Sequence, residues 1–158
     1  MELTIRRAVP GDERTLAELN AFVHELHVAG HPSRFRTASL HEVTAYFGGL
    51  LSDEVATVWI AEEEGALVGY VCALLRERPE DVFSRARRWT ELDQIAVRTD
   101  QHRRGIGRAL VERVVEAART DGVDDIELTC GSFNGAAAEA FRRLGFEPVT
   151  ERLRLRTR

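Results

Sequence analysis

The sequence contains no lysine among its 158 residues, and all 22 of its basic side chains are arginine. The phosphate-binding P-loop, which requires a lysine after its last glycine, is therefore excluded. The arginine bias is typical of a GC-rich bacterial genome rather than of a functional demand, so we expect a bacterial protein. The net charge of −4 argues against broad binding to nucleic acid, and it is compatible with cationic ligands.

Long hydrophobic runs are also missing, and no stretch approaches the length that a membrane span requires. The first residues, M-E-L-T-I-R, lack the apolar core of a signal peptide, so we expect a cytoplasmic protein without a membrane partner. Only two cysteines occur, Cys72 and Cys130, both in apolar, strand-like segments. In the cytoplasm such residues are predicted to be buried thiols rather than a disulfide.

What the sequence does contain is typical of one globular domain, with 44% hydrophobic and 30% charged residues and no linker or repeat over 1–158. Hydrophobic periodicity predicts the element order β-α-α-β-β-β-α-β-α-β. Helices are predicted to start near residues 12, 39, 106 and 134, and residues 76–88 are predicted to form a charged loop. The predicted strands are 3–9, 55–61, 67–75, 89–98, 123–130 and a half-buried strand over 148–158.

The stretch V-R-T-D-Q-H-R-R-G-I-G-R-A-L, residues 97–110, places Gly105 and Gly107 after two arginines, between a predicted strand and a predicted helix. The first N–H groups of a helix lack intrahelical partners, and the helix dipole adds partial positive charge there. Glycines let the main chain approach a phosphate closely. The pattern therefore indicates a phosphate site, although Leu110 stands where a dinucleotide fingerprint has its third glycine.

This loop resembles the pyrophosphate loop of the GNAT acetyltransferase superfamily, Q/R-x-x-G-x-G/A, with His102 where the family usually has Gln or Arg. The hairpin W-I-A-E-E-E-G-A-L-V-G-Y-V and the later segment N-G-A-A-A-E-A-F-R-R-L-G-F resemble two further family motifs in the family's order. The resemblance implies a GNAT fold of the α/β (α+β) class. It also implies a mixed central sheet of six or seven strands with four helices, and a single N-acetyltransferase domain over 1–158.

The resemblance assigns acetyl-CoA as the cofactor, with backbone N–H groups of the fourth strand along its pantetheine. Asn134 either bonds the cofactor or caps the last helix. Phe141 replaces a tyrosine common in the family and is expected to be a core or pantetheine-wall aromatic. The expected cofactor contacts are Ile95, Ala96, Val97, His102, Arg103, Arg104, Gly105, Ile106, Gly107, Arg108, Asn134 and Phe141.

Two acids, Glu91 and Asp93, are candidates for the base that deprotonates an amine. The histone acetyltransferase branch of the family places its catalytic glutamate eleven residues before the first loop position, which matches the distance from Glu91 to His102. Asp93 is expected on the same face of the strand, because side chains alternate. Both acids could instead reach solvent or pair with Arg87 or Arg88.

The proton donor for the CoA thiolate stays open, because phenylalanine at position 141 has no hydroxyl; the alternatives are water, Ser132, Cys130 and Tyr70. A metal site is not expected, although three histidines have helical spacing. No H-E-x-x-H pattern accompanies them, and contacts to the acceptor or a solvated face are favoured instead. These histidines are His24, His27 and His31.

We therefore expect an acetyl-CoA-dependent N-acetyltransferase that moves an acetyl group to a primary amine of a small molecule or peptide by direct attack. The alternative is a non-catalytic acyl-CoA-binding sensor or subunit, which the missing tyrosine favours. No motif identifies the acceptor, because the loops and first two helices that form acceptor pockets say little about function. The oligomeric state stays open, with a homodimer among the alternatives.

Overall fold

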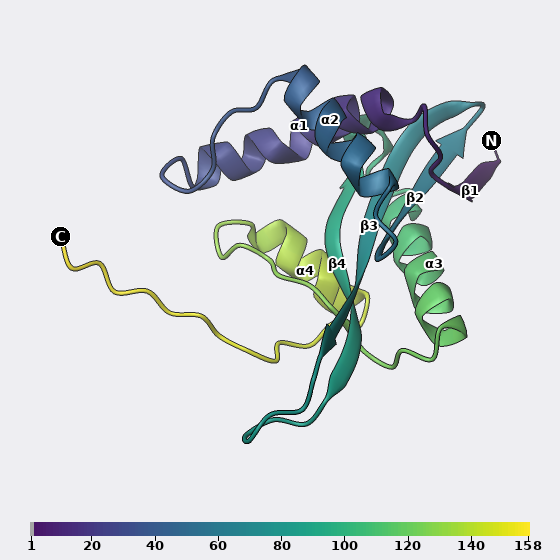
Figure 1. Ribbon diagram of the computed structural model, residues 1–158. Coiled ribbons are helices and arrows are strands. Elements are labelled where there is room, and N and C mark those ends of the chain that lie inside the picture. Colours follow the sequence, from purple (N-terminus) through teal and green to yellow (C-terminus); the bar gives the residue numbers. More distant parts are fainter. Residues whose placement is uncertain (1) are drawn as a thin grey trace.

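A computed structural model describes residues 2–158, and within that range one mixed five-stranded sheet is flanked by four α-helices (Figure 1). The strand order is β1-β2-β3-β4-β5; β1 to β4 are antiparallel, and β5 is parallel to β4. In chain order the elements are β1 (Leu3–Arg7), α1 (Glu13–Gly30), α2 (Leu40–Leu51), β2 (Ala56–Glu63), β3 (Ala66–Arg78), β4 (Arg87–Val97), the 3-10 helix η1 (Thr99–Gln101), α3 (Ile106–Thr120), β5 (Ile126–Glu127) and α4 (Gly135–Arg143).

The sheet separates two apolar layers, and the alternation of strand side chains supplies both of them. Tyr70 on β3 points into the layer beneath α1 and α2, where its ring meets Phe47 edge-on at 5.6 Å between centroids. The next residue, Val71, points into the opposite layer and packs with Leu110 and Val114 of α3. The central strands are thus covered on both faces, which fixes their position.

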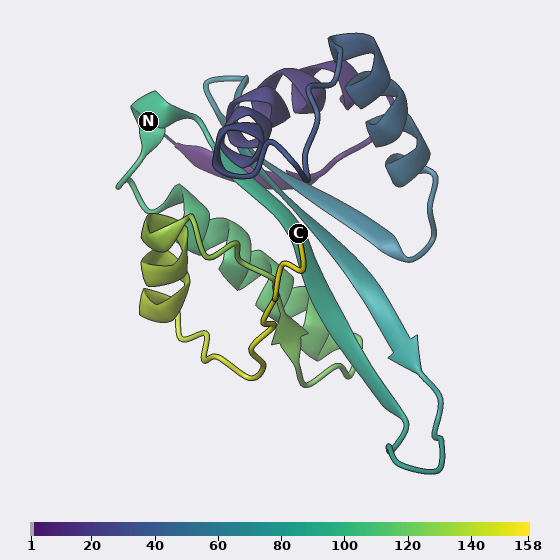
Figure 2. The same cartoon turned by 90° about the vertical axis from the view of Figure 1, so that its left-hand side faces the viewer.

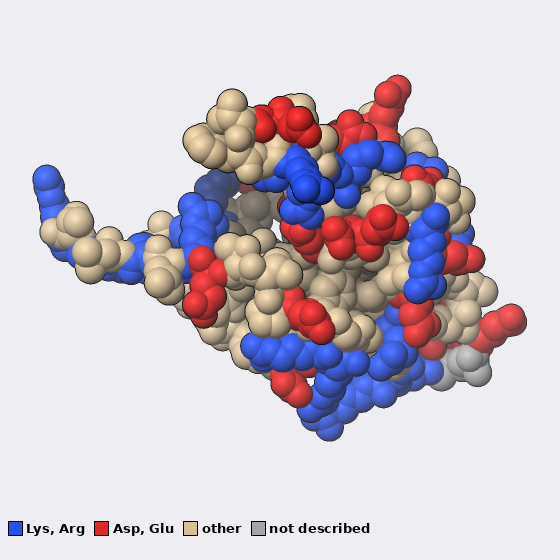
Figure 3. Space-filling model, turned by 90° about the horizontal axis from the view of Figure 1, so that it is seen from below, with Lys and Arg blue, Asp and Glu red and all other residues tan. Residues whose placement is uncertain are grey.

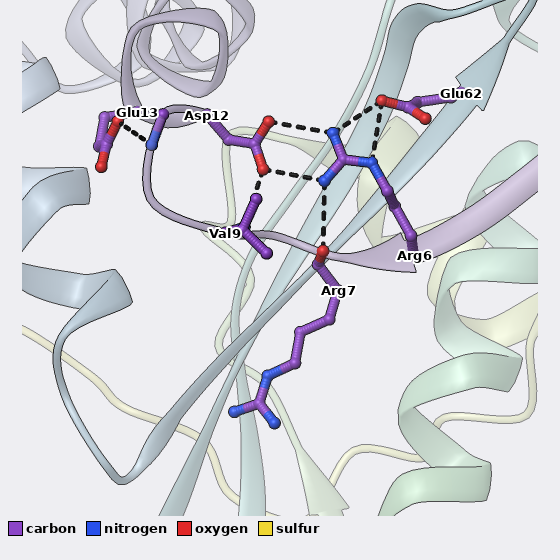
Figure 4. Close-up of polar contacts among 7 residues, drawn as sticks. Arg6, Arg7, Val9, Asp12, Glu13 and Glu62 are labelled. Carbon is purple, nitrogen blue, oxygen red and sulfur yellow. Dashed lines mark hydrogen bonds and ion pairs between the residues drawn. The ribbon is translucent and has the colours of Figure 1, made fainter.

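A partly buried ion network joins the turn between β1 and α1 to β2 (Figure 4). The Arg6 guanidinium donates to both Asp12 oxygens at 2.9 and 3.0 Å and to Glu62 at 2.7 Å. Asp12 also accepts from the Val9 N–H at 2.8 Å. The hydrogen bonds from Arg6 hold the pKa of Asp12 below its ordinary value of 3.8.

The sheet opens at the far side of β4. The register between β3 and β4 shifts at Cys72 and Ala73, so Asp93 has no partner residue on β3 and forms a bulge. β5 pairs with β4 only at Thr90–Ile126 and Glu91–Glu127. Figure 2 shows the short β5 beside the long β4 before the chain turns away toward α4. Beyond the bulge, the outer edge of β4 therefore has no neighbouring strand in residues 2–158.

Three expectations for the second half of the chain are wrong. The strand expected over 123–130 is reduced to Ile126–Glu127, because pairing with β4 ends at the bulge. The half-buried strand expected over 148–158 is absent; residues 147–158 are exposed and carry no regular structure. Alternation predicts which face a strand buries, but the strand forms only beside a free edge. Residues 2–158 consequently contain five strands instead of six or seven.

The charged loop expected over 76–88 is also wrong at both ends, since β3 continues to Arg78 and β4 begins at Arg87. Beyond the core this two-stranded ribbon meets solvent on both faces, so charged side chains fit it. Arg88 pairs with Glu77 across the ribbon at 2.9 Å, and the Arg87 guanidinium lies over the Trp89 ring at 4.3 Å. Strand pairing thus continues where hydrophobic alternation has already ended.

Candidate functional site

Two connected hollows occupy the opening beside β4. The inner groove, about 570 Å³, lies between α1, α2, the bulge of β4 and the segment 128–131. The loop groove, about 320 Å³, continues from β4 to the glycine loop before α3. The two hollows share four lining residues, namely Val23, Ile95, Ala137 and Phe141. A ligand lying in both would pass along the free edge of β4.

The glycine loop is built to present N–H groups to the loop groove. Gly105 has φ +79°, in the left-handed region that glycine adopts without strain, and it directly precedes α3. The first main-chain bond into the helix runs from the Ala109 N–H to the Gly105 carbonyl at 3.0 Å. The N–H groups of residues 106–108 therefore lack intrahelical acceptors, which makes this end of α3 suited to a phosphate.

His102 ties this loop to the end of β4. Its Nε2 donates to the carbonyl of Val97 at 2.9 Å. The side chain thus holds the loop in place where the resemblance expects Gln or Arg, and the departure from the motif does not disrupt the turn. Arg103, at φ +65°, also lines the loop groove.

The other two arginines of the loop are engaged elsewhere. Arg104 donates to the nearly buried Glu63 at 2.8 Å and also contacts Gln101. Arg108 faces Glu112 along the helix at 3.9 Å. Neither arginine lines the loop groove. The side chain of Ile106 packs in the core, and this residue is only 2% exposed. Of these three arginines, only Arg103 lines the loop groove, together with the backbone of the loop.

The edge of β4 carries the second set of donors. The Arg98 N–H donates to Val68 on β3 at 2.9 Å, so strand alternation turns the main-chain groups of Ala96 toward β3 as well. The N–H groups of Ile95 and Val97 then face the opposite way, into the grooves. Only two of the three strand residues expected to contact the cofactor, Ile95 and Val97, therefore direct their N–H groups into the grooves, and Ala96 does not.

Asn134 and Phe141 lie where the grooves meet α4. The Asn134 side chain accepts from the Ala137 N–H at 3.1 Å and so caps the helix, while it also lines the inner groove. Phe141 lines both hollows and packs edge-on against Phe146 at 5.7 Å. Its ring is a wall residue without a polar group to offer.

The two candidate bases have different surroundings. Asp93, on the bulge, is exposed, lines the inner groove and accepts from Gln94 Nε2 at 3.2 Å. Glu91 accepts from Arg76 Nε at 3.0 Å and is not among the residues lining either hollow. Arg76, rather than the expected Arg87 or Arg88, is the partner of Glu91. The structure therefore places one acid in the groove and the other in an ion pair beside it.

A polar network behind Asp93 was not predicted from the sequence. Gln94 Oε1 accepts from the Tyr70 hydroxyl at 2.9 Å and from Asn20 at 3.0 Å, while Gln94 Nε2 donates to the Tyr46 hydroxyl at 3.0 Å. Partial burial and the charge of Asp93 raise the pKa of Tyr46 to about 12. The network joins α1, α2, β3 and β4, so no local motif could have revealed it.

The proposed proton donors are not equally placed. Tyr70 is fully buried, and burial raises its pKa far above the ordinary phenol value. Ser132 is exposed and lines neither hollow. Cys130 lines the inner groove, and partial burial raises the pKa of its thiol, so the protonated form predominates at neutral pH. Both cysteines are free, as the sequence predicts, but only Cys72 is buried, and Cys130 is half-buried. Burial raises the pKa of Cys72 to about 12.

The histidines of α1 contribute to the far end of the inner groove. His24 donates to the Arg36 carbonyl at 2.7 Å and His27 to the Val23 carbonyl at 2.8 Å. Residues 2–158 contain no group of three His, Cys, Asp or Glu side chains placed to hold a metal ion. The third histidine, His31, packs edge-on against Phe133 at 4.8 Å.

Phe133 contacts both His27 and His31, and no sequence pattern predicted this contact. Its ring also meets His27 edge-on at 5.7 Å, so the loop before α4 contacts the end of α1. A Cβ at Gly30 would lie 2.3 Å from this ring, and one at Gly131 would lie 2.4 Å from it. Both glycines therefore provide space for Phe133, which joins the two walls of the inner groove.

A helix N-terminus with free N–H groups, a free strand edge and a groove that contains a carboxylate together offer hydrogen-bond donors suited to a phosphorylated ligand. The sequence profile of the acetyltransferase (GNAT) family matches residues 20–146. The chain belongs to this family.

Named relatives and solved structures agree with that assignment. N-acetyltransferase 8 of Rattus norvegicus is 32% identical over 101 residues, which are 64% of this chain and 44% of the relative. This chain thus spans less than half the length of the curated relative. The BH1408 protein of Bacillus halodurans, a tetramutant in its crystal structure, has a TM-score of 0.92 at 25% identity and covers 97% of this chain and 99% of its own.

The same fold occurs in a solved structure with a bound ligand. AAC(6′)-Iy in complex with a bisubstrate analogue, CoA-S-monomethyl-acetylneamine, has a TM-score of 0.79 at 16% identity, with 100% of this chain and 99% of that chain covered. At this identity the likeness establishes the fold alone. Within residues 2–158, no helix combines the length and the apolar character needed to cross a membrane.

Proposed function

We propose that the protein is an acetyl-CoA-dependent N-acetyltransferase acting on a primary amine of a small molecule or peptide. The observation that carries this proposal is the continuity of the two grooves, from the glycine loop along the free edge of β4 to Asp93. The family supports an acyl transfer, and a neighbour of the same fold is in complex with a CoA-containing bisubstrate analogue, which supports CoA as the cofactor.

The residues fit acetyl-CoA, which would supply the acetyl group as a thioester. The N–H groups of residues 106–108 are suited to its pyrophosphate, and those of Ile95 and Val97 to its pantetheine amides and thioester oxygen. Gly107 leaves room at the loop, because an added Cβ would meet only Val97 Cγ2, at 4.0 Å. Phe141 would cover the pantetheine with an apolar wall.

Asp93 is the base in this proposal, and Glu91 has a structural role. Asp93 reaches the inner groove, where an ammonium group would sit, whereas Glu91 is occupied by Arg76. Asp93 would take one proton from the ammonium group, and the neutral amine would attack the thioester carbon directly. The nitrogen would lose its second proton to solvent as the C–S bond breaks and the thiolate leaves. No enzyme nucleophile is needed, and the thiolate takes its proton from solvent, because no hydroxyl occupies position 141.

A thiol-release assay with acetyl-CoA and a panel of amines, including an aminoglycoside and a short peptide, tests the activity. We expect turnover with at least one amine and a decrease in kcat of about 10²-fold in Asp93→Asn. Glu91→Gln is the matched control and should keep kcat near the parental value. A loss of turnover in Glu91→Gln but not in Asp93→Asn would reverse the assignment of the base.

The non-catalytic alternative keeps one supporting observation, the phenylalanine at position 141. An acyl-CoA sensor would gain thermal stability from acetyl-CoA, as any ligand of the folded state provides. It would release no thiol with any amine above the uncatalysed rate. Binding without turnover across the whole panel would therefore replace the enzymatic proposal by the sensor.

A further inference from the structure

The inner groove has a largely apolar wall that contains few charged side chains. Its aliphatic and aromatic lining includes Val23, Phe35 and Val43. Among the described residues, the arginine and carboxylate side chains that line it are Arg36, Glu42 and Asp93. A cationic ligand in such a groove is oriented by a small number of charges within an apolar surface. The pairing of these three side chains therefore determines how many positive charges a ligand can carry.

Glu42 is already neutralised by protein groups. Its Oε1 accepts from Arg36 Nη2 at 2.9 Å, and its Oε2 accepts from the Ser39 N–H at 2.8 Å. The hydrogen bond from Arg36, followed by that from Ser39, lowers the pKa of Glu42 from its ordinary value of 4.5 to about 2. The carboxylate is thus ionised at neutral pH and has a donor on each oxygen. It offers no unpaired negative charge to a ligand.

Arg36 is held in the wall of the groove by main-chain contacts as well. Its carbonyl accepts from His24 Nε2 of α1 at 2.7 Å. Its Nη1 donates to the Thr37 carbonyl at 3.1 Å. The guanidinium therefore keeps one orientation between the main chain and Glu42. A cation that enters the groove meets this positive charge in the wall.

Asp93 differs from Glu42 because none of the ion pairs among residues 2–158 includes it. Its hydrogen-bond donor is the neutral amide of Gln94, whose Nε2 lies 3.2 Å from Asp93 Oδ2. The negative charge of Asp93 is thus not cancelled by an arginine. The inner groove consequently provides one uncompensated carboxylate, which suits one ammonium group.

We propose that the acceptor is a primary monoamine with an apolar body, and that the pair of Arg36 and Glu42 selects against diamines and polyamines. This inference rests on the proposed function, in which the ammonium group of the acceptor meets Asp93. A second ammonium group would lose hydration against the apolar wall, would find no free carboxylate and would be repelled by Arg36. Aminoglycosides, which carry several ammonium groups, are therefore expected to be poor acceptors.

The surface around the protein does not favour polycations either. Acidic and basic side chains are interspersed over the face that Figure 3 shows, so this face does not form a continuous acidic field. Attraction of a polyamine by a broad negative surface would require such a field. The number of ammonium groups that the inner groove can pair thus decides between the two kinds of acceptor.

Calorimetric titration of hexylamine and of hexamethylenediamine into the protein saturated with CoA tests the proposal. The two amines have the same carbon chain and differ in the second ammonium group. We expect the parent to bind hexylamine about tenfold or more tightly than the diamine, because the second charge is left unpaired. Binding is measured without acetyl transfer, so the result does not depend on turnover.

Two arginine variants test the role of the ion pair. Arg36→Gln removes the positive charge and leaves Glu42 as a second free carboxylate. It should reduce the ratio of the two Kd values about fivefold, the size expected for an exposed pair. Arg34→Gln is the matched control, since Arg34 is a neighbouring arginine that does not line the inner groove, and it should keep the parental ratio.

A parent that binds the diamine as tightly as hexylamine, or that binds neither amine, would overturn the proposed class of acceptor. An unchanged ratio in Arg36→Gln, or an equal change in Arg34→Gln, would overturn the role of Arg36. Absence of thiol release with every amine would contradict the proposed function alone, because the ratio of the Kd values is obtained without catalysis.

Discussion

The two edges of β4 differ in how completely their main-chain groups pair with a neighbouring strand. Toward β3 the strand is paired over its whole length, from Arg87 to Val97, with one bulge. Toward β5 it is paired at only two positions, Thr90 and Glu91. The first side builds the core, and the second side leaves N–H groups, a carboxylate and a groove available to ligands. The unpaired edge of β4 is therefore the part of the sheet on which the proposed function depends.

The same contrast separates the two parts of the chain. Residues 3–97 form four strands and two helices that share a buried core, whereas residues 121–158 contain a two-residue strand, one short helix and an exposed tail. The earlier part is held by its own packing. The later part has fewer internal contacts, and acetyl-CoA is the ligand that we propose for it.

The largest effect on stability is expected from removing an aromatic ring of the core that packs on the paired strands. Phe47 is fully buried against Tyr70, so Phe47→Ala should lower the free energy of unfolding by about 3–5 kcal/mol. Phe146→Ala is the matched change in the later part, where the ring is half-buried, and should cost about 1–2 kcal/mol. Urea denaturation of both variants measures the difference; equal losses would contradict the contrast between the two regions.

A change in the glycine loop, next to the unpaired edge of β4, should affect the binding of acetyl-CoA rather than folding. Gly107→Glu places a carboxylate where the pyrophosphate is expected, and it should weaken acetyl-CoA binding by about 100-fold or more through like-charge repulsion. Gly107→Ala should bind within a few-fold of the parent, because its Cβ fits. Isothermal titration of both variants checks this; equal affinities would place the phosphates elsewhere.

A smaller effect on stability is expected from breaking the Arg6 network, which joins β1 to β2. Arg6→Met should cost about 1 kcal/mol at pH 7, because Arg6 is partly exposed and its pairs are screened. The pKa of Asp12 is lower in the folded than in the unfolded protein, so its contribution is present above about pH 3.8 and is lost as the pH falls through the folded-state value. The difference in stability between parent and variant should therefore shrink in acid; a constant difference would exclude Asp12 as the cause.

The smallest effect is expected from restoring the family's hydroxyl. If solvent protonates the thiolate and this step is not limiting, Phe141→Tyr should leave kcat within about twofold of the parent. Steady-state kinetics with the best amine of the panel gives the answer. An increase of tenfold or more would indicate that the missing hydroxyl limits the reaction.

Sequence patterns predicted the fold well where periodicity and packing agree, as for α3 and for the start of α2 near residue 39, where Ser39 and Glu42 form a capping box. They predicted the glycine loop because its chemistry is local. They did not predict the bulge at Asp93, which depends on the register against β3, or the network around Gln94, which joins four elements. The strand predicted over 148–158 was wrong for a related reason, because alternation predicts a strand without identifying the sheet edge that pairs with it.

Hydrogen exchange of the parent protein with and without acetyl-CoA tests the central claim most directly. The account predicts that the amides of Ile95, Val97 and residues 106–108 exchange rapidly in the free protein, since they have no internal acceptor, and become protected on binding. Amides of β1 and β2 should exchange equally slowly in both states. Protection confined to other segments, with no change at the β4 edge and the start of α3, would contradict the account.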